Sequence, residues 1–213
     1  MRAKVNNVMS NVALLETATR LAHIQLFYAN QGTNLARAAM AGSDTFEEMR
    51  HYPSHDVVDQ AAGTRFYYHA HRSRRMPDTE HGHFHLFVYN EKQPDNYYHL
   101  AALALDARGQ PLRWFTTNRW VTGERWQNAT RIERELSRFQ IQTRGRMAPV
   151  ANWLTGMVQL FSPQLANLVR RRDAVMARHF AKQDLETVFE DRYLDVITEC
   201  PASLPKRILQ LGR

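Results

Sequence analysis

The sequence predicts an α+β protein, with one antiparallel sheet of about four strands over residues 65–117 between N-terminal and C-terminal helices. Apolar residues recur at helical spacing before residue 50, alternate at strand spacing in the middle and return to helical spacing after residue 130. Consecutive strands segregated from helices are typical of the α+β class. A chain of 213 residues can bury one core, so we expect a single domain over residues 1–213.

The N-terminal region, residues 5–50, is predicted to be helical. A long amphipathic helix ends at Gly32, and a short helix follows from Asn34. The segment Thr45-Phe-Glu-Glu48 has a capping-box pattern and predicts a third helix. This helix stops before Pro53, because the residue before a proline avoids helical dihedral angles. The apolar stripe of the first helix is Val8, Val12, Leu15, Ala18, Ala22 and Leu26.

The middle of the chain is predicted to form four strands, because aromatic and aliphatic residues alternate there with polar ones. Turn-forming residues separate the later strands, at Asp95-Asn96 and at Arg108-Gly-Gln-Pro111. Short links of this kind favour an antiparallel meander. The expected strands are Arg65–His71, His83–Tyr89, Tyr97–Leu105 and Leu112–Thr117.

The C-terminal region, residues 130–199, is again predicted to be helical. Thr130-Arg-Ile-Glu133 is a second capping box. Apolar stripes at helical spacing follow it, and Pro201 ends the last of them. The expected helices cover residues 149–161, 164–181 and about 185–199.

The composition excludes several classes of protein. Apolar residues make up 44% and charged residues 23% of the chain, which excludes wholesale disorder and a fibre. The longest apolar run, Leu100–Leu105, is too short to cross a bilayer, and the N-terminus lacks the apolar core of a signal peptide. The single cysteine, Cys200, cannot form an internal disulfide. We therefore expect a cytoplasmic protein without a membrane partner.

The positive charge is concentrated in one part of the chain. The net charge is +7, and residues 111–182 contain thirteen basic and four acidic residues, a formal charge of +9. A basic face there could bind a small anionic molecule or the phosphates of a nucleic acid. A solvated helix face is the alternative. No zinc-finger spacing or RNA-recognition signature supports specific base reading.

The most informative pattern is a group of five histidines between residues 69 and 85. Residues i and i+2 of a strand share a face, so His69 and His71 point the same way, as do His83 and His85. If the two strands pair around residues 72–82, the register sets His69 opposite His85 and His71 opposite His83. Opposed β-carbons are roughly 5 Å apart. His99 on the next strand could join this patch.

Imidazoles this close together indicate a metal site. Four cations would repel one another, so at least some of the rings are neutral near pH 7. Neutral imidazole suits divalent zinc, iron or manganese. Glu80 could be a further ligand or the base that activates water, in a metal-dependent hydrolase or oxygenase. A metal-free binding pocket and a structural polar layer are the alternatives.

Arginines and an asparagine outside the histidine group are candidates for ligand binding. Arg72 or Arg119 could hold an anionic substrate, and Asn118 with Arg119 could form a pocket rim. Turn and cap chemistry is the alternative interpretation of this segment. Arg172 falls inside the apolar stripe of the helix over residues 164–181. A buried arginine there requires an acidic partner or an anionic ligand, unless its head group reaches water.

The sequence His81-Gly-His83-Phe-His85-Leu-Phe87 resembles the signature of the histidine triad nucleotide hydrolases. The resemblance implies that His83, the middle histidine, would attack a nucleotide phosphate. Gly82 departs from the pattern, because an apolar side chain is usual at its position. The match covers seven residues only.

A broader resemblance covers roughly residues 10–200. Together, four blocks are similar to an uncharacterised bacterial family that is known only as a domain of unknown function. The resemblance implies a bacterial source and a shared fold, and it supplies no activity, cofactor or catalytic residue. The blocks are His51-Tyr-Pro53, Phe66-Tyr-Tyr-His-Ala-His-Arg72, Glu80-His-Gly-His-Phe-His-Leu-Phe87 and Thr116-Thr-Asn-Arg-Trp-Val-Thr-Gly-Glu124.

Overall fold

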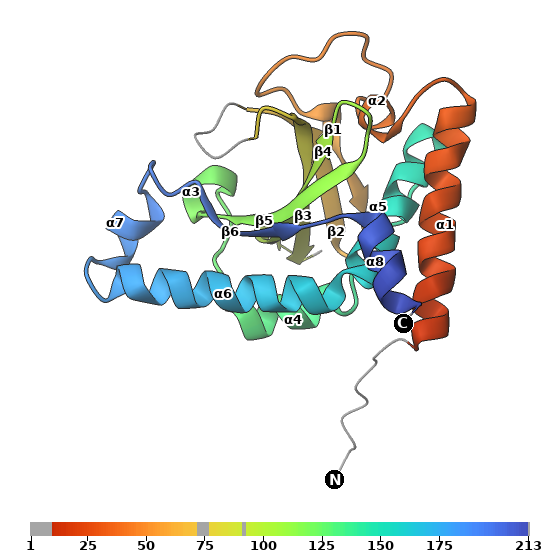
Figure 1. Cartoon of the computed structure of the whole chain (residues 1–213). Helices are drawn as coiled ribbons and strands as arrows, with labels where there is room; N and C mark the ends of the chain where they lie inside the picture. The colour runs from red at the N-terminus through yellow and green to blue at the C-terminus, as the bar shows by residue number, and fades with distance from the viewer. Residues whose placement is uncertain (1–9, 72–76, 91–92, 213) are drawn as a thin grey trace.

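The computed structural model describes residues 10–71, 77–90 and 93–212 of the chain (Figure 1). Its centre is an antiparallel sheet of six strands, in which each strand pairs with the next one along the chain. The strands are β1 (Tyr52–Asp59), β2 (Thr64–His69), β3 (Glu80–Asn90), β4 (Gln93–Asp106), β5 (Pro111–Thr117) and β6 (Val196–Pro201).

Helices precede the sheet and fill the long connection between β5 and β6. They are α1 (Asn11–Asn30), α2 (Leu35–Ala39), α3 (Arg119–Thr122), α4 (Ala129–Leu136), α5 (Ala148–Leu160), α6 (Ser162–Phe180), α7 (Leu185–Phe189) and α8 (Leu204–Leu211), with a 3₁₀ turn at Gly145–Met147. The α+β class and the antiparallel meander are therefore confirmed. The sheet has six strands rather than about four.

The two unpredicted strands lie at the edges of the sheet. In β1 the pairing register with β2 jumps between Tyr52 and Val57, so the strand lacks the alternation that would have revealed it. The expected helix over residues 185–199 is wrong in its second half. Helix α7 ends at Phe189, and Val196–Pro201 pairs with β5 as strand β6. The apolar spacing in this segment fits a short helix followed by a strand equally well.

The capping-box pattern at residues 45–48 does not begin a helix. This segment is a loop, and the side chain of Tyr52 holds it: the hydroxyl donates to the carbonyl of Thr45 at 3.0 Å and accepts from the backbone N–H of Glu47 at 2.8 Å. Tertiary contact with Tyr52 thus overrides the local helix signal.

Helix α1 forms as expected but presents a different face to the core. Val12 and Leu26 of the predicted stripe are 66% and 55% exposed, whereas Leu21 is buried. The reason is the close crossing with α5. A β-carbon on Gly156 of α5 would lie 2.7 Å from Leu21 Cδ2, so a larger residue there would force the side chain of Leu21 to move.

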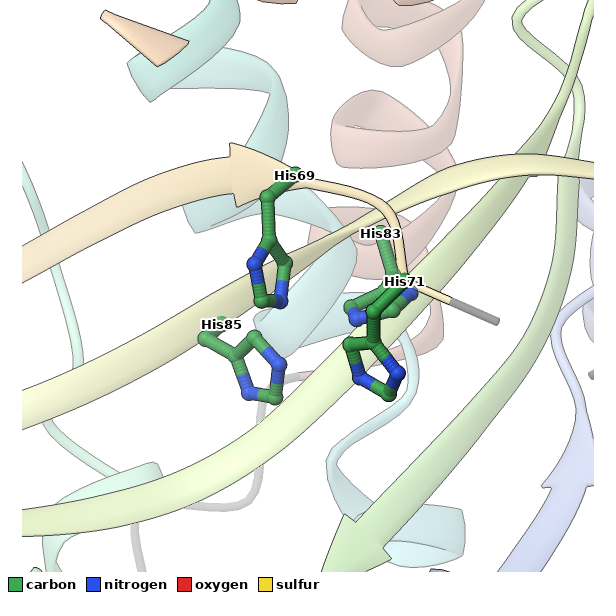
Figure 2. Close-up of side chains that lie close together, drawn as sticks. All are labelled: His69, His71, His83 and His85. Carbon is green, nitrogen blue, oxygen red and sulfur yellow. The ribbon is translucent and has the colours of Figure 1, made fainter. Parts of the chain in front are cut away.

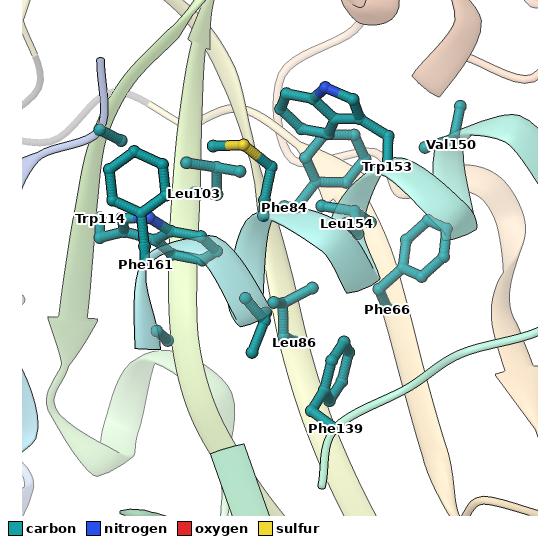
Figure 3. Packing of buried hydrophobic residues seen from close by; sticks show 14 of the residues in the cluster. Phe66, Phe84, Leu86, Leu103, Trp114, Phe139, Val150, Trp153, Leu154 and Phe161 are labelled. Atoms are coloured by element: carbon teal, nitrogen blue, oxygen red, sulfur yellow. The ribbon is translucent and has the colours of Figure 1, made fainter. Parts of the chain in front are cut away.

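The main hydrophobic core lies between one face of the sheet and the helices (Figure 3). On β2 and β3 the residues that enter it are Phe66, Tyr68, Phe84 and Leu86, which alternate with residues of the opposite face. Trp153 and Leu154 of α5 belong to the same core. His69, His83 and His85 therefore occupy the face of the sheet that does not enter this core.

Candidate metal site

A β-bulge at the start of β3 sets the positions of the site residues. Glu80 pairs with Asp106 and Gly82 with Leu105, so His81 is an extra residue in β3. His81 turns to the core side, where its Nδ1 lies 2.8 Å from the hydroxyl of Tyr68. Because of the bulge, Glu80 and His83 share the histidine face although they are three residues apart.

Gly82 makes this arrangement sterically possible. A β-carbon at this position would lie 2.8 Å from the carbonyl oxygen of His69 and 2.8 Å from the hydroxyl of Tyr68. The glycine that interrupts the histidine-triad pattern therefore serves the packing of β3 on β2. The three histidines of that pattern do not share a face, because His81 points away from His83 and His85.

The register of β2 and β3 differs by two residues from the expected one. His69 pairs with His83, Tyr67 pairs with His85, and His71 lies beyond the end of β2. The expected pairing of His69 with His85 is therefore wrong. A shift of two residues leaves every side chain on the same face, so the histidines still meet.

Four imidazoles converge at this point (Figure 2). One ring nitrogen from each of His69, His71, His83 and His85 can be chosen so that all four lie within 4.8 Å of one another. His69, His83 and His85 are buried, and His71 is partly exposed. This set, which we call the histidine cluster, could hold a metal ion.

The hydrogen bonds of the cluster leave the converging nitrogens free. His83 Nδ1 lies 2.7 Å from Glu80 Oε1, and His85 Nδ1 lies 2.9 Å from His99 Nε2. Among the described residues, the Nε2 atoms of His83 and His85 and both ring nitrogens of His69 are buried and have no hydrogen-bond partner. Each unpaired buried polar atom costs about 1–3 kcal/mol, so a group that satisfies several of them at once stabilises the fold.

Burial disfavours the charged form of the three buried imidazoles, those of His69, His83 and His85. Burial, and then the neighbouring His83 and His71, lower the pKa of His69 from 6.5 to about 2. Burial likewise lowers the pKa of His83 and of His85 well below the ordinary value, and adjacent histidines add to the effect. Neutral imidazoles keep a lone pair for a metal ion, so no proton has to be displaced before binding.

Glu80 orients His83. Its Oε2 accepts hydrogen bonds from Arg113 Nε at 3.2 Å and from Arg113 Nη2 at 3.0 Å, and Arg113 also pairs with Glu199. Burial raises the pKa of Glu80, and the charge and hydrogen bonds of Arg113 oppose that rise. Held in this way, Glu80 accepts a hydrogen bond from the Nδ1–H of His83, which leaves the lone pair on Nε2 directed into the cluster.

Sequence reasoning missed Arg113. The alternation in residues 112–117 could have indicated its position, because it places Arg113, Phe115 and Thr117 on one face of β5. The contacts of Glu80 favour a positioning role over the expected roles of ligand or base, because both of its oxygens are already occupied.

A second chain of hydrogen bonds supports His85. His99 Nδ1 lies 3.2 Å from Thr117 Oγ1, and the backbone N–H of His99 donates to Glu124 Oε2 at 2.6 Å. Burial and then the charge of Arg172 lower the pKa of His99 to about 3. Burial raises the pKa of Glu124 to about 7. The structure thus brings His99 to the cluster as a partner of His85.

The other candidate residues have contacts elsewhere. Asn118 caps α3 by accepting from the backbone N–H of Arg119, and it donates to the carbonyl of Val188. Arg119 pairs with Glu186 and Glu190 of the α7 segment. Arg172 is buried, pairs with Asp173 and lies over the ring of Trp126. Arg72 lies outside the described residues.

A small pocket adjoins the cluster on the side of His71 and His83. Its cavity volume is about 10 Å³, which is room for about one water molecule. Besides these two histidines it is lined by Glu80, Arg113, Phe115, Thr117, Val121, Asp195 and Val196. A water molecule in this pocket would therefore lie beside His71 and His83 of the cluster.

Comparison with known proteins identifies a family. Neither a curated protein nor a solved structure is significantly similar to the chain. In the part of the chain that the structure describes, no helix has the length and hydropathy needed to span a membrane. Residues 15–202 match the family model described as a domain of unknown function, DUF6969. The match covers most of the chain, which therefore belongs to this family of unknown function.

Proposed function

We propose that the histidine cluster binds one divalent transition-metal ion and that this ion is the functional centre of the protein. The observation that carries the proposal is the set of buried, unpartnered nitrogens on His69, His83 and His85, which converge within 4.8 Å together with His71. A chain without a ligand at this point would leave several polar atoms unsatisfied in its interior.

The surroundings of the cluster support the same proposal. Histidine ligands of metals commonly hydrogen-bond through their second nitrogen to a carboxylate or another polar group. Glu80 provides this contact for His83, and His99 provides it for His85. Tetrahedral ligands at a zinc–nitrogen distance of about 2.0–2.1 Å lie ~3.4 Å apart, so the rings need only a modest contraction to coordinate an ion.

His71 distinguishes a catalytic site from a structural one. His69, His83 and His85 are held on paired strands, whereas His71 follows the end of β2 and lines the pocket. A catalytic metal site keeps one position for water or substrate, and a structural site is closed by its protein ligands. We infer that three histidines fix the ion and that the position near His71 exchanges with ligands from the pocket.

The identity of the ion separates two reaction classes. Neutral imidazole ligands leave the full charge of the ion unbalanced, which would make it a strong Lewis acid. Zinc would favour a metal-dependent hydrolase, whereas iron or manganese would favour an oxygenase. Both classes would use the same exchangeable position beside the pocket.

A non-catalytic module that binds an anionic metabolite or a nucleic acid is the alternative proposal. It has less support, because several arginines of the basic segment are paired within the chain. Arg119 contacts two glutamates, Arg138 contacts Glu135, and Arg170 contacts Glu133. These pairs reduce the positive charge available to a partner.

Elemental mass spectrometry of the untagged protein tests the proposal. We expect near-stoichiometric zinc, iron or manganese in the wild type and none in the double variant His69→Ala/His85→Ala. The matched control is His55→Ala, an exposed histidine of β1 that should leave the metal content unchanged. Absence of metal from the wild type, even after incubation with each ion, would overturn the proposal.

A further inference from the structure

We propose that a groove beside helix α4 binds an organic phosphate, whose phosphate group accepts hydrogen bonds from Arg131 and Arg138. The cavity volume of this groove is about 460 Å³, within the range of roughly 300–1,000 Å³ that small-molecule sites usually have. The groove lies where β2 begins and β3 ends, because Thr64 and Val88 line it. These two residues are on the core side of the sheet, whereas His69 is on the other face at the opposite end of β2. The groove is therefore separate from the histidine cluster.

The charged residues of the groove form a single group. Among the described lining residues, these are Arg131, Glu135 and Arg138. The side chain of Glu135 is only 1% exposed, and its Oε1 lies 2.8 Å from Arg131 Nε. Its Oε2 accepts a hydrogen bond from Arg138 Nε at 2.8 Å. One carboxylate thus balances one of two guanidinium groups and leaves a formal charge of +1. Replacement of a buried ionic group by apolar residues is often neutral or stabilising, so stability alone does not explain this one.

Glu135 leaves hydrogen-bond donors free for a ligand, because it contacts the Nε side of each guanidinium. Among the described residues, Nη1 and Nη2 of Arg131 and Nη1 of Arg138 have no hydrogen-bond partner. Arg131 also lies over the ring of Tyr98, 5.5 Å from its centroid. These contacts hold the guanidinium in place, which reduces the entropy lost when it binds an anion. Planar forks of N–H donors match the oxygens of a phosphate group.

The size and the walls of the groove favour an organic phosphate over a phosphate ion or a carboxylate. A phosphate ion would fill only a small part of a cavity of about 460 Å³. Val88, Tyr98 and Phe139 supply apolar surface beside the two arginines, which suits the carbon skeleton of a ligand. A phosphate monoester offers three acceptor oxygens and a charge of about −1.5 to −2 near pH 7. A carboxylate offers two oxygens and a single charge, so it would use fewer of the free donors.

Isothermal titration calorimetry with phenyl phosphate tests this inference. The wild type should bind phenyl phosphate more tightly than inorganic phosphate, which lacks an apolar part, and more tightly than benzoate, which has a single charge. Arg138→Gln removes a guanidinium that is 62% exposed, so the variant should fold. It should weaken the binding of phenyl phosphate about tenfold, because a hydrogen bond between charged groups is lost. Arg131→Gln should weaken it at least as much.

Arg170→Gln is the matched control. Arg170 also pairs with a glutamate of α4, Glu133, and is 62% exposed, but it does not line the groove. This variant should bind phenyl phosphate as the wild type does. Removal of metal by a chelator should also leave the affinity unchanged, because the groove is separate from the histidine cluster. The proposal would be overturned by equal affinity in the wild type and Arg138→Gln, by benzoate or inorganic phosphate binding as tightly as phenyl phosphate, or by loss of binding on removal of metal.

Discussion

The two faces of the sheet are built from the same strands but are completed in different ways. Phe84 and Leu86 enter the helix-covered core, where apolar side chains surround them and exclude water. His83 and His85 alternate with them and are just as buried, yet each retains a nitrogen without a partner. The buried side chains of the first face are apolar and need no further partner, whereas those of the second face leave buried nitrogens that a bound ion would satisfy. Equal burial therefore does not imply an equal role in stability.

Substitution of adjacent residues on the two faces should give the largest contrast. Phe84→Ala removes a fully buried ring from the core and should destabilise the protein by about 3–5 kcal/mol. His85→Ala should cost the metal-free protein less, because it also removes an unpaired polar atom. Urea denaturation of the metal-free variants measures both values. A larger loss for His85→Ala would contradict this comparison.

Weakening the support of one histidine should have an intermediate effect. Glu80→Gln keeps the size of the side chain but removes the charge that Arg113 and His83 share. Loss of such outer contacts typically lowers metal affinity about 10–100-fold. Competition with a chromophoric chelator would measure this change. The control is Glu186→Gln, which removes an exposed partner of Arg119 and should leave the affinity as it is.

Acid should act on the histidine face first. The pKa of His69 is about 2 in the folded protein and 6.5 ordinarily, so the unfolded chain takes up a proton before the folded one does. Stability from this residue is fully present above pH 6.5 and falls with decreasing pH, by up to about 1.4 kcal/mol per pH unit. Thermal unfolding of the metal-free protein between pH 7 and pH 5 measures the slope. The double variant His69→Ala/His85→Ala should show a flatter profile, and an unchanged slope would contradict this assignment.

The sequence was sufficient to predict the faces of the sheet but not the pairing within them. Alternation predicts that His69, His83 and His85 share a face. This prediction holds whether His69 pairs with His85 or with His83. The choice between pairing His69 with His85 and pairing it with His83 depends on tertiary packing, which includes Phe66 opposite Leu86. Local spacing contains no information on that choice.

Two other features depended on contacts that are distant in sequence. Arg113 reaches Glu80 across β4, and the two residues are 33 positions apart in the sequence. The residues next to either of them therefore do not indicate that they form a pair. Strand β6 is short and lies beside β5, which is about 80 residues earlier in the chain, as the pair Thr116 and Thr198 shows. In both cases the sequence shows residue types that suit the contact, but only the fold brings them together.

The bulge at His81 shifts by one residue the alternation of side chains between the two faces of β3. Before the bulge, Glu80 points to the histidine face. After the bulge, the alternation resumes so that His83 points to the same face. Regular pairing of the same four residues without the bulge would place Glu80 on the opposite side of the sheet from His83, because they are three residues apart. Transfer of this side-chain arrangement to another protein would therefore require a partner strand that accommodates the bulge, and Gly82, as well as Glu80 and the histidines.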